Sequence, residues 1–167
     1  MLNPCSLCKA ECCKTYTITV TIFDLARIAS KCGLKIQDMA YFHEPRLLTY
    51  DPDMVLDTTD GYGYYLLGLK SHPCRFLGKD DRCVAHDSAP LSCRRFPNTL
   101  GKRLNMRFCP LPSQLLFRFK GADIGAGEVV AELEAHKRLV RIWNKKKGTR
   151  EECLSYLIEN EKATGSR

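Results

Sequence analysis

The sequence lacks the features of membrane and secreted proteins. None of its apolar runs approaches the length that crosses a bilayer, so we predict no membrane association. The first residues, MLNPCSLCK, lack the basic and then apolar layout of a secretory signal peptide. We therefore expect a cytoplasmic protein, in a reducing compartment where structural disulfides are disfavoured.

Motifs of several enzyme classes are missing as well. No glycine-rich nucleotide loop follows a predicted strand, and the segment GADIGAG at 121–127 is interpreted as a flexible connector before a helix. Cys8-x3-Cys12 lacks the following C-x2-C of the cysteine triad that grips adenosylmethionine. A methyltransferase-like or redox enzyme is one alternative function, but the sequence predicts no catalytic residue.

Ten cysteines stand out against this background. Two of them, Cys32 and Cys153, lie in predicted helices, where we expect each to pack as a small buried hydrophobe. The other eight are the predicted metal and cofactor ligands: Cys5, Cys8, Cys12, Cys13, Cys74, Cys83, Cys93 and Cys109. In a reducing compartment, thiols in loops rich in proline and glycine favour metal binding. A disulfide framework is the alternative if the compartment is oxidising.

The spacing of the first four cysteines bears on the type of metal. Cys5 and Cys8 form a C-x2-C unit, whose backbone turn lets two thiolates reach one ion from the same side. Cys12 or Cys13 can add a third thiolate. Because the side chains of these two adjacent residues point in different directions, they suit two separate metal centres better than one. The downstream cysteines are expected in turns that fold over the N-terminal loop and complete the set.

Thiolate ligands suit both zinc and iron–sulfur clusters. Zinc ribbons use two C-x2-C pairs, whereas this chain has one, followed by a third cysteine. That arrangement is closer to the tripod that grips a cubane cluster. We therefore predict an iron–sulfur protein with one or two [4Fe–4S] clusters in a structural or redox role, and zinc is the alternative.

The formal net charge of +7 raises the question of nucleic-acid binding. Two segments are basic: Arg94, Arg95, Lys102, Arg103 and Arg107, and then Lys137, Arg138, Arg141, Lys145, Lys146, Lys147 and Arg150. Metal-bound thiolates offset part of this charge, and aromatic residues that stack on bases are few in both segments. A solvated helix face explains the second segment more simply. The predicted partner is an unidentified protein or substrate, with RNA as a weaker alternative for a zinc-binding scaffold.

Hydrophobic periodicity and turn residues predict an α+β fold: a small single domain with antiparallel hairpins, cysteine-rich metal-binding loops and flanking helices. The chain shows no internal repeat, low-complexity tract or interior linker. We divide it into a cysteine-cluster metal-binding core, residues 1–120, and a C-terminal helical extension, residues 121–167, packed on the same domain.

Capping residues and apolar stripes set the expected elements. Thr21 and Thr149 are each followed three residues later by an acid, as at a helix N-terminus. The expected helices run from Thr21 to Gly33, over Lys35–His43, from Glu128 to about Lys147, and from Thr149 through Glu159. The expected strands are Tyr16–Val20, Met54–Leu56 and Tyr64–Leu69, with a turn at Asp60-Gly61, and a hairpin about Gly101 within Arg95–Phe108. Met1–Thr15 and Cys74–Cys93 are expected to be loops, and 162–167 to fray.

Three parts of the sequence together resemble a known family. They are CSLCKAECC at 5–13, CRFLGKDDRCVAHDSAPLSCRRFP at 74–97, and the helix start at 21–24. The chain is similar to cysteine-cluster proteins that are named for a CxxCxxCC motif, described as zinc- or iron-chelating and often as containing iron–sulfur clusters. The resemblance spans roughly 5–109. Flagellin lysine methylases look like distant relatives, which implies methyl-group chemistry.

The chain departs from the family pattern at three places. Its motif is C-x2-C-x3-CC, one residue longer than the family name states. His86 stands where the family commonly has tyrosine, and Ala89 where it commonly has arginine before the proline. If that tyrosine and arginine serve a shared activity, this chain lacks it. His86 is interpreted as a solvated or hydrogen-bonded loop residue rather than a ligand.

Overall fold

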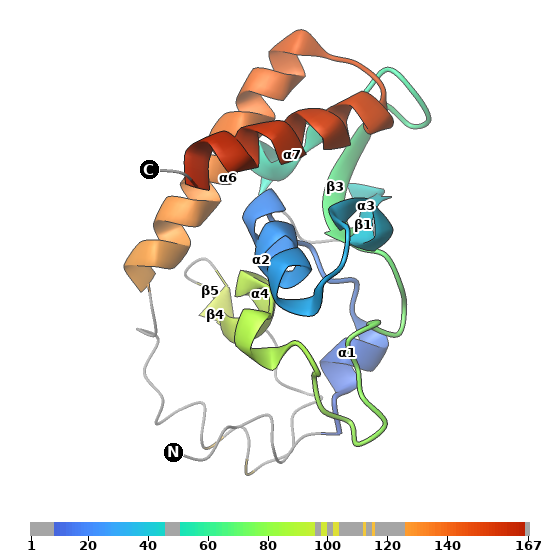
Figure 1. The fold of residues 1–167 in the computed structure, drawn as a ribbon, viewed down its shortest axis with the longest axis vertical. Helices are drawn as coiled ribbons and strands as arrows, with labels where there is room; N and C mark the ends of the chain where they lie inside the picture. The colour runs from blue at the N-terminus through green and yellow to red at the C-terminus, as the bar shows by residue number, and fades with distance from the viewer. Residues whose placement is uncertain are drawn as a thin grey trace.

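Figure 1 shows the fold in a computed structural model of the chain, which describes residues 9–45, 51–95, 98–99, 102–103, 112, 115 and 126–165. Its helices and antiparallel strands confirm the α+β prediction. The elements are α1 (Glu11–Thr15), α2 (Ile22–Cys32), α3 (Ile36–Met39), β1 (Ala40–His43), η3 (Pro52–Met54), β2 (Leu56–Asp57), β3 (Tyr64–Leu69), η4 (His86–Ser88), α4 (Leu91–Arg95), β4 (Asn98–Thr99), β5 (Lys102–Arg103), α6 (Ala126–Lys146) and α7 (Arg150–Gly165).

The larger sheet has three antiparallel strands in the order β1-β3-β2. β3 is the central strand, and its register pairs Leu69 with Ala40 of β1 and Tyr65 with Leu56 of β2. The turn between β2 and β3 contains Gly61 at φ 61°, a left-handed conformation that glycine adopts without strain. This confirms the predicted hairpin. The second hairpin is confirmed by β4 and β5, which pair on either side of position 101.

Only the first half of the helix predicted over Lys35–His43 is helical. α3 ends at Met39, and the expected continuation to His43 is the edge strand β1. Tyr41 and Phe42 are aromatic residues that favour strands, and β3 offers them a hydrogen-bonding edge. Because that partner lies more than twenty residues further along the chain, the local pattern could not reveal it.

The start and end of α2 follow the prediction. Thr21 Oγ1 accepts a hydrogen bond from Asp24 N–H at 3.0 Å, and Asp24 Oδ2 accepts one from Thr21 N–H at 2.9 Å. This reciprocal capping box satisfies two backbone donors that the first helical turn leaves unpaired. Gly33 follows the last helical residue at φ 65°, the left-handed conformation common at helix C-termini.

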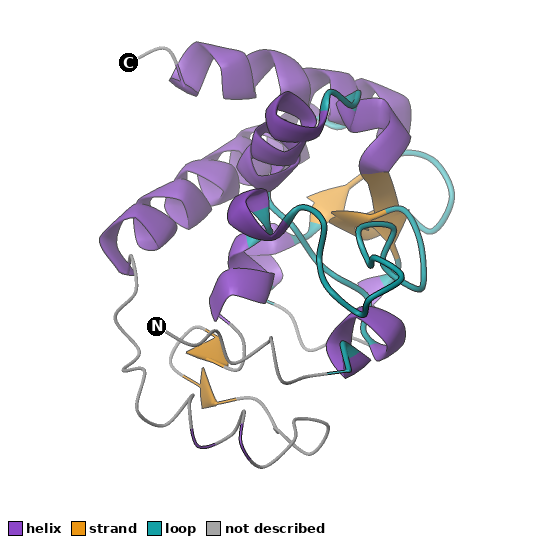
Figure 2. Cartoon of the chain, turned by 60° about the horizontal axis from the view of Figure 1, so that its bottom comes forward, coloured by secondary structure: helices purple, strands orange, loops and turns teal. Residues whose placement is uncertain are grey.

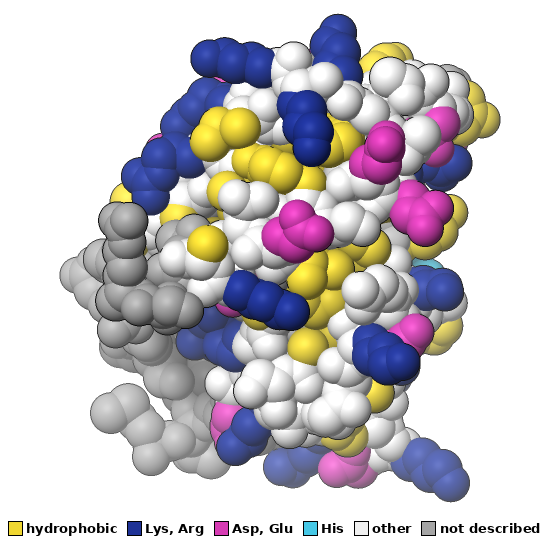
Figure 3. Space-filling model, turned by 45° about the horizontal axis from the view of Figure 1, so that its top comes forward, with side chains coloured by type: hydrophobic (Ala, Val, Ile, Leu, Met, Phe, Trp, Pro, Cys, Tyr) yellow, Lys and Arg dark blue, Asp and Glu magenta, His cyan; other side chains and the backbone are white. Residues whose placement is uncertain are grey.

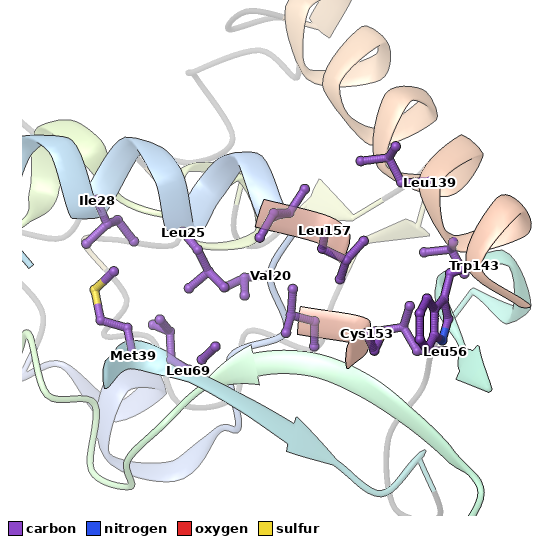
Figure 4. Packing of buried hydrophobic residues seen from close by; sticks show 14 of the residues in the cluster. Val20, Leu25, Ile28, Met39, Leu56, Leu69, Leu139, Trp143, Cys153 and Leu157 are labelled. Carbon is purple, nitrogen blue, oxygen red and sulfur yellow. The ribbon is translucent and has the colours of Figure 1, made fainter. Parts of the chain in front are cut away.

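The helices α6 and α7 lie across α2 and close the hydrophobic core (Figure 1). Leu25 and Ile28 of α2 face Met39 and Leu69, while Trp143 of α6 packs beside Leu56 and Cys153 (Figure 4). α7 extends to Gly165, beyond the expected end at Glu159, and 162–165 are helical rather than frayed. The division into a core and an extension stays a prediction.

The side chains of α6 also complete the hydrogen bonding of strand β2. Asn144 Oδ1 accepts from Asp57 N–H at 2.9 Å, and its Nδ2 donates to the Val55 carbonyl at 2.8 Å. Trp143 Nε1 donates to the Asp57 carbonyl at 2.6 Å. These contacts occupy the exposed edge of β2, where unpaired backbone groups would otherwise face α6. The long helix is thus joined to the sheet by both polar and apolar contacts.

A buried histidine of α6 contacts the first turn of α2. His136 is fully buried, and its Nδ1 accepts a hydrogen bond from Ile22 N–H at 3.3 Å. Its Nε2 has no hydrogen-bond partner among the described residues. Burial lowers the pKa of His136 from 6.5 to about 4, because a charged imidazole would lose its hydration there.

We predict that this histidine destabilises the fold on acidification. The unfolded chain binds the proton more readily, so the stability due to neutral His136 is complete above pH 6.5 and is lost as the pH falls toward 4. Between pH 7 and 5 this loss is about 2 kcal/mol. Urea unfolding of the wild type and His136→Gln at both pH values measures it, and the variant should lose much less.

The comparison with His136→Gln is needed because two acids act in the opposite direction. Burial raises the pKa of Asp24 and Glu132, so these carboxyls stabilise the fold on acidification. They are present in both proteins and cancel in the difference. His86→Gln serves as the control, because His86 is exposed. An equal pH dependence in the wild type and His136→Gln would contradict the prediction.

Candidate metal centre

Five of the eight predicted ligands lie within the described residues. Cys12 and Cys13 belong to α1, Cys74 and Cys83 to the turns before η4, and Cys93 to α4. The other three, Cys5, Cys8 and Cys109, lie outside the described residues. None of the described cysteines is in a disulfide bond.

Two of the cysteine segments are held together by main-chain and charged contacts. Cys74 N–H donates to the Cys13 carbonyl at 2.8 Å, so the segment after β3 is hydrogen-bonded to α1. Lys14 Nζ lies 2.7 Å from Asp81 Oδ1 at the tip of the same turn region. In Figure 1, α1 and the green 70–90 segment lie side by side at the lower end of the molecule.

The turn region between Cys74 and Cys83 returns the chain on itself. Leu77 N–H donates to the Cys74 carbonyl at 3.0 Å, and Leu77 forms an isolated antiparallel bridge with Cys83. Val84 N–H donates to the Phe76 carbonyl at 2.9 Å. Figure 2 shows loop and turn (teal) over much of the region between the short helices and the sheet. The predicted turns at these two cysteines are therefore present.

Cys93 lies on a third segment, α4, and is close to the cysteines of the other two segments. Burial raises the pKa of the Cys93 thiol, and negative charge on Cys13, Cys74 and Cys83 raises it further. Burial likewise raises the pKa of Cys83, with a smaller effect from Cys74. Such mutual effects require short separations in a partly desolvated region. Cys93 thus lies within electrostatic range of Cys13, Cys74 and Cys83, and we call these four residues the thiol cluster.

The donor chemistry of the thiol cluster fits a soft metal. Several thiolates cannot form side by side without a positive charge between them, and a bound metal supplies that charge. Within the ranges that the structure describes, no three His, Cys, Asp or Glu side chains are arranged to hold a metal ion. The described thiols do not form a complete metal site by themselves, and the assignment of the eight cysteines as ligands stays a prediction.

Two expectations about local structure around the ligands are corrected. Cys12 and Cys13 lie on the short helix α1, not in a loop, and Cys93 lies on α4, not in a turn. Both helices have five residues, too few to be stable alone or to show an apolar period. Consecutive side chains on a helix point about 100° apart, so Cys12 and Cys13 still fit different partners better than one ion.

The two cysteines outside the motif differ from each other. Cys153 is fully buried as predicted, and burial raises its pKa to about 12. Cys32, by contrast, is exposed, so the prediction of a buried residue is wrong. It follows Ile28 by four positions on the apolar stripe of α2, but the helix ends there and the core does not extend that far. A negative charge on Cys32 raises the pKa of Cys83, which places it near the thiol cluster.

The basic residues of the C-terminal helices are partly neutralised within the fold. Lys137 Nζ lies 2.7 Å from Asp51, Arg150 Nε lies 2.7 Å from Asp60, and Arg141 pairs with Asp53 at 3.5 Å. Lys and Arg side chains nevertheless gather along α6 in Figure 3. RNA binding there stays a prediction.

Three further observations bear on predictions made from the sequence. His86 begins the short helix η4 rather than lying in a loop. Its side chain is exposed as expected, and its Nδ1 lies 3.8 Å from Asp87 Oδ1. Among the described helices, none is both long enough and apolar enough to cross a membrane. Of the first basic segment, only the Arg94 side chain is described, and it is exposed.

Comparison with known proteins identifies the cysteine motif. Residues 4–110 match the family described as "CxxCxxCC: Putative zinc- or iron-chelating domain". No curated protein and no solved structure matches the chain, so the distant similarity to flagellin lysine methylases is not shown. The match covers more than half of the chain and includes all eight predicted ligands. The chain therefore belongs to the CxxCxxCC family of zinc- or iron-chelating domains.

Proposed function

We propose that this protein holds an iron–sulfur cluster of the [4Fe–4S] type through cysteine thiolates, as a structural or electron-transfer centre. The observation that carries the proposal is the thiol cluster, in which three separate chain segments bring thiols together in a partly buried region. The ligands would come from the eight motif cysteines. The iron–sulfur core would supply positive charge to the thiolates, although core and thiolates together are negatively charged, and in a redox role it would be an electron-accepting centre.

The surroundings of the thiol cluster support thiolate ligation. Burial raises the pKa of the Cys74 thiol, and a backbone hydrogen bond from Phe76 and the nearby positive charge of Arg75 offset part of that effect. Arg94 follows Cys93 on α4 and is exposed to solvent. Cations beside a cluster reduce the cost of its negative charge. The partial burial of the described motif cysteines also limits access of water and oxidants.

The sequence spacing favours a cluster over zinc. The single C-x2-C unit with a third cysteine resembles a cubane tripod, whereas a zinc ribbon needs a second pair. Zinc is the second candidate because the same thiolates bind it and the family description names it. In that case the domain is a zinc-stabilised scaffold that binds a protein or RNA partner, and the basic face of α6 is its leading interaction surface.

Purification without oxygen tests the proposal. We predict a brown protein that contains iron and acid-labile sulfide in similar amounts, with broad visible absorption that bleaches on reduction or exposure to oxygen. Metal and sulfide analysis of the wild-type chain measures this directly. Stoichiometric zinc, with no acid-labile sulfide even after anaerobic reconstitution, would refute the cluster and favour the scaffold.

A further inference from the structure

The carboxylate of Asp24 has more partners than a helix cap requires. Oδ2 accepts from Thr21 N–H within the capping box of α2. Oδ1 accepts from Leu91 N–H at 2.8 Å, across 67 residues of sequence, and also contacts the guanidinium of Arg27. The side chain is 2% exposed. A buried carboxylate therefore joins the first turns of α2 and α4, although its capping role needs only α2.

The helix that it reaches is the one that carries Cys93. α4 has five residues, too few to be stable without tertiary contacts, and Leu91 N–H is one of the first-turn donors that no helical carbonyl can satisfy. A second contact lies next to it, where Ser92 Oγ donates to the Thr19 carbonyl at 3.0 Å. Both tethers precede Cys93 directly and come from the segment around the start of α2.

The same carboxylate is linked to α6. Arg27 Nη1 donates to Glu132 Oε1 at 2.9 Å and to Oε2 at 3.1 Å, a two-point contact with the long helix. Arg27 thus compensates the negative charge of Asp24 and links Asp24 to Glu132 of α6. Because α2 and α6 pack together in that core, Asp24 offers α4 a fixed point of attachment.

We propose that Asp24 is a positioning residue for the metal centre: it fixes α4, and hence Cys93, relative to the other members of the thiol cluster. The inference rests on the proposed function, in that Cys93 is taken as a ligand. Groups that orient metal ligands without touching the metal change metal affinity about 10- to 100-fold when they are lost. A residue that only capped α2 would have no such effect on the metal.

Asp24→Asn and Thr21→Ala form a matched pair of variants. Thr21→Ala removes the hydroxyl half of the capping box and leaves both carboxylate oxygens of Asp24, and its bond to Leu91, in place. Asp24→Asn removes the charge and one of the two acceptor oxygens, so one oxygen must serve the donors of Thr21, Leu91 and Arg27. The first readout is Zn²⁺ affinity, measured by chelator competition on reduced, metal-free protein. The second is hydrogen exchange of the 91–95 amides without metal, which reports whether α4 is docked and does not depend on metal binding.

We expect Asp24→Asn to weaken Zn²⁺ binding at least about tenfold and to speed exchange in α4 at least about tenfold. Thr21→Ala should stay within about threefold of the wild type in both, because its Asp24–Leu91 bond is intact. If Asp24→Asn does not fold, Asp24→Glu keeps the charge opposite Arg27 while moving the carboxylate by one methylene, and we expect the same direction of change.

Three outcomes would overturn the inference: wild-type metal affinity in Asp24→Asn, unchanged exchange in α4, or equal losses in Thr21→Ala. Failure of the proposed function looks different. Stoichiometric zinc in the wild-type chain would refute the cluster and leave the Zn²⁺ readout valid, whereas a wild-type chain that binds no metal would remove Cys93 as a ligand. In that event the claim about the metal falls with it, and hydrogen exchange still decides whether Asp24 anchors α4.

Discussion

Cys93→Ser is expected to leave the protein metal-poor and prone to aggregation. Serine has nearly the shape of cysteine, but its hydroxyl does not ionise to a soft ligand at neutral pH. Metal ligation would join α1, the Cys74–Cys83 turn region and α4, so part of the binding free energy is also folding free energy. Metal content per chain and the melting temperature measure both consequences.

Cys153 lies outside the motif and provides the control for this variant. Cys153→Ala changes a buried thiol on α7 and should keep the metal content of the wild type. Cys153→Ala should lower the melting temperature only modestly, because it removes one small buried side chain. Wild-type metal content and melting in Cys93→Ser would show that this cysteine is not a ligand.

Trp143→Ala is expected to cause the largest loss of stability among single core substitutions. Trp143 is fully buried, its ring lies 5.6 Å from that of Tyr156 between centroids, and its Nε1 donates to the Asp57 carbonyl. Removing it leaves a large cavity where α6, α7 and β2 meet, at a cost of about 3–5 kcal/mol. The free energy of unfolding in urea measures this cost.

The adjacent residue gives a matched control. Ile142 is 55% exposed on the same helix, so Ile142→Ala should cost less than about 0.5 kcal/mol. Folded Trp143→Ala should also keep its metal, since the thiol cluster lies on other elements. Similar small losses in both variants would contradict the placement of Trp143 in the core.

Features set by neighbouring residues could be predicted from the sequence. The capping box at Thr21, the end of α2 at Gly33 and the hairpin turn at Asp60-Gly61 depend on residues a few positions apart. So does the start of α7, where Thr149 N–H donates to Glu152 Oε2 at 2.7 Å. Local hydrogen bonds and backbone conformations decide these positions, and no tertiary contact overrides them.

Features that depend on distant partners could not be predicted. Ala40–His43 is a strand because β3 lies beside it, and Asn144 satisfies the edge of β2 from 87 residues away. The early acid of α2 suggested only a cap, whereas Asp24 also binds α4. Each case needs the position of a second segment, which a local pattern of hydrophobic and polar residues does not contain.

For the candidate site, too, some features could be predicted from the sequence and others depend on the packing of distant segments. The number and spacing of cysteines were enough to predict metal binding and the family. The match to residues 4–110 confirms the family, which is described as zinc- or iron-chelating. The convergence of Cys13, Cys74 and Cys93 from three segments, and the exposure of Cys32, follow from packing. Identical cysteine spacings can serve zinc or iron–sulfur clusters, so the identity of the metal depends on chemistry beyond the spacing.

X-ray absorption at the iron and zinc edges of anaerobically purified protein tests the central claim, ligation by cysteine thiolates, most directly. The spectrum reports which metal is bound and which atoms surround it. Our account predicts iron in a first shell of sulfur alone, with further iron atoms in the next shell. A first shell of oxygen and nitrogen, for either metal, would contradict the assignment of the cysteines as ligands.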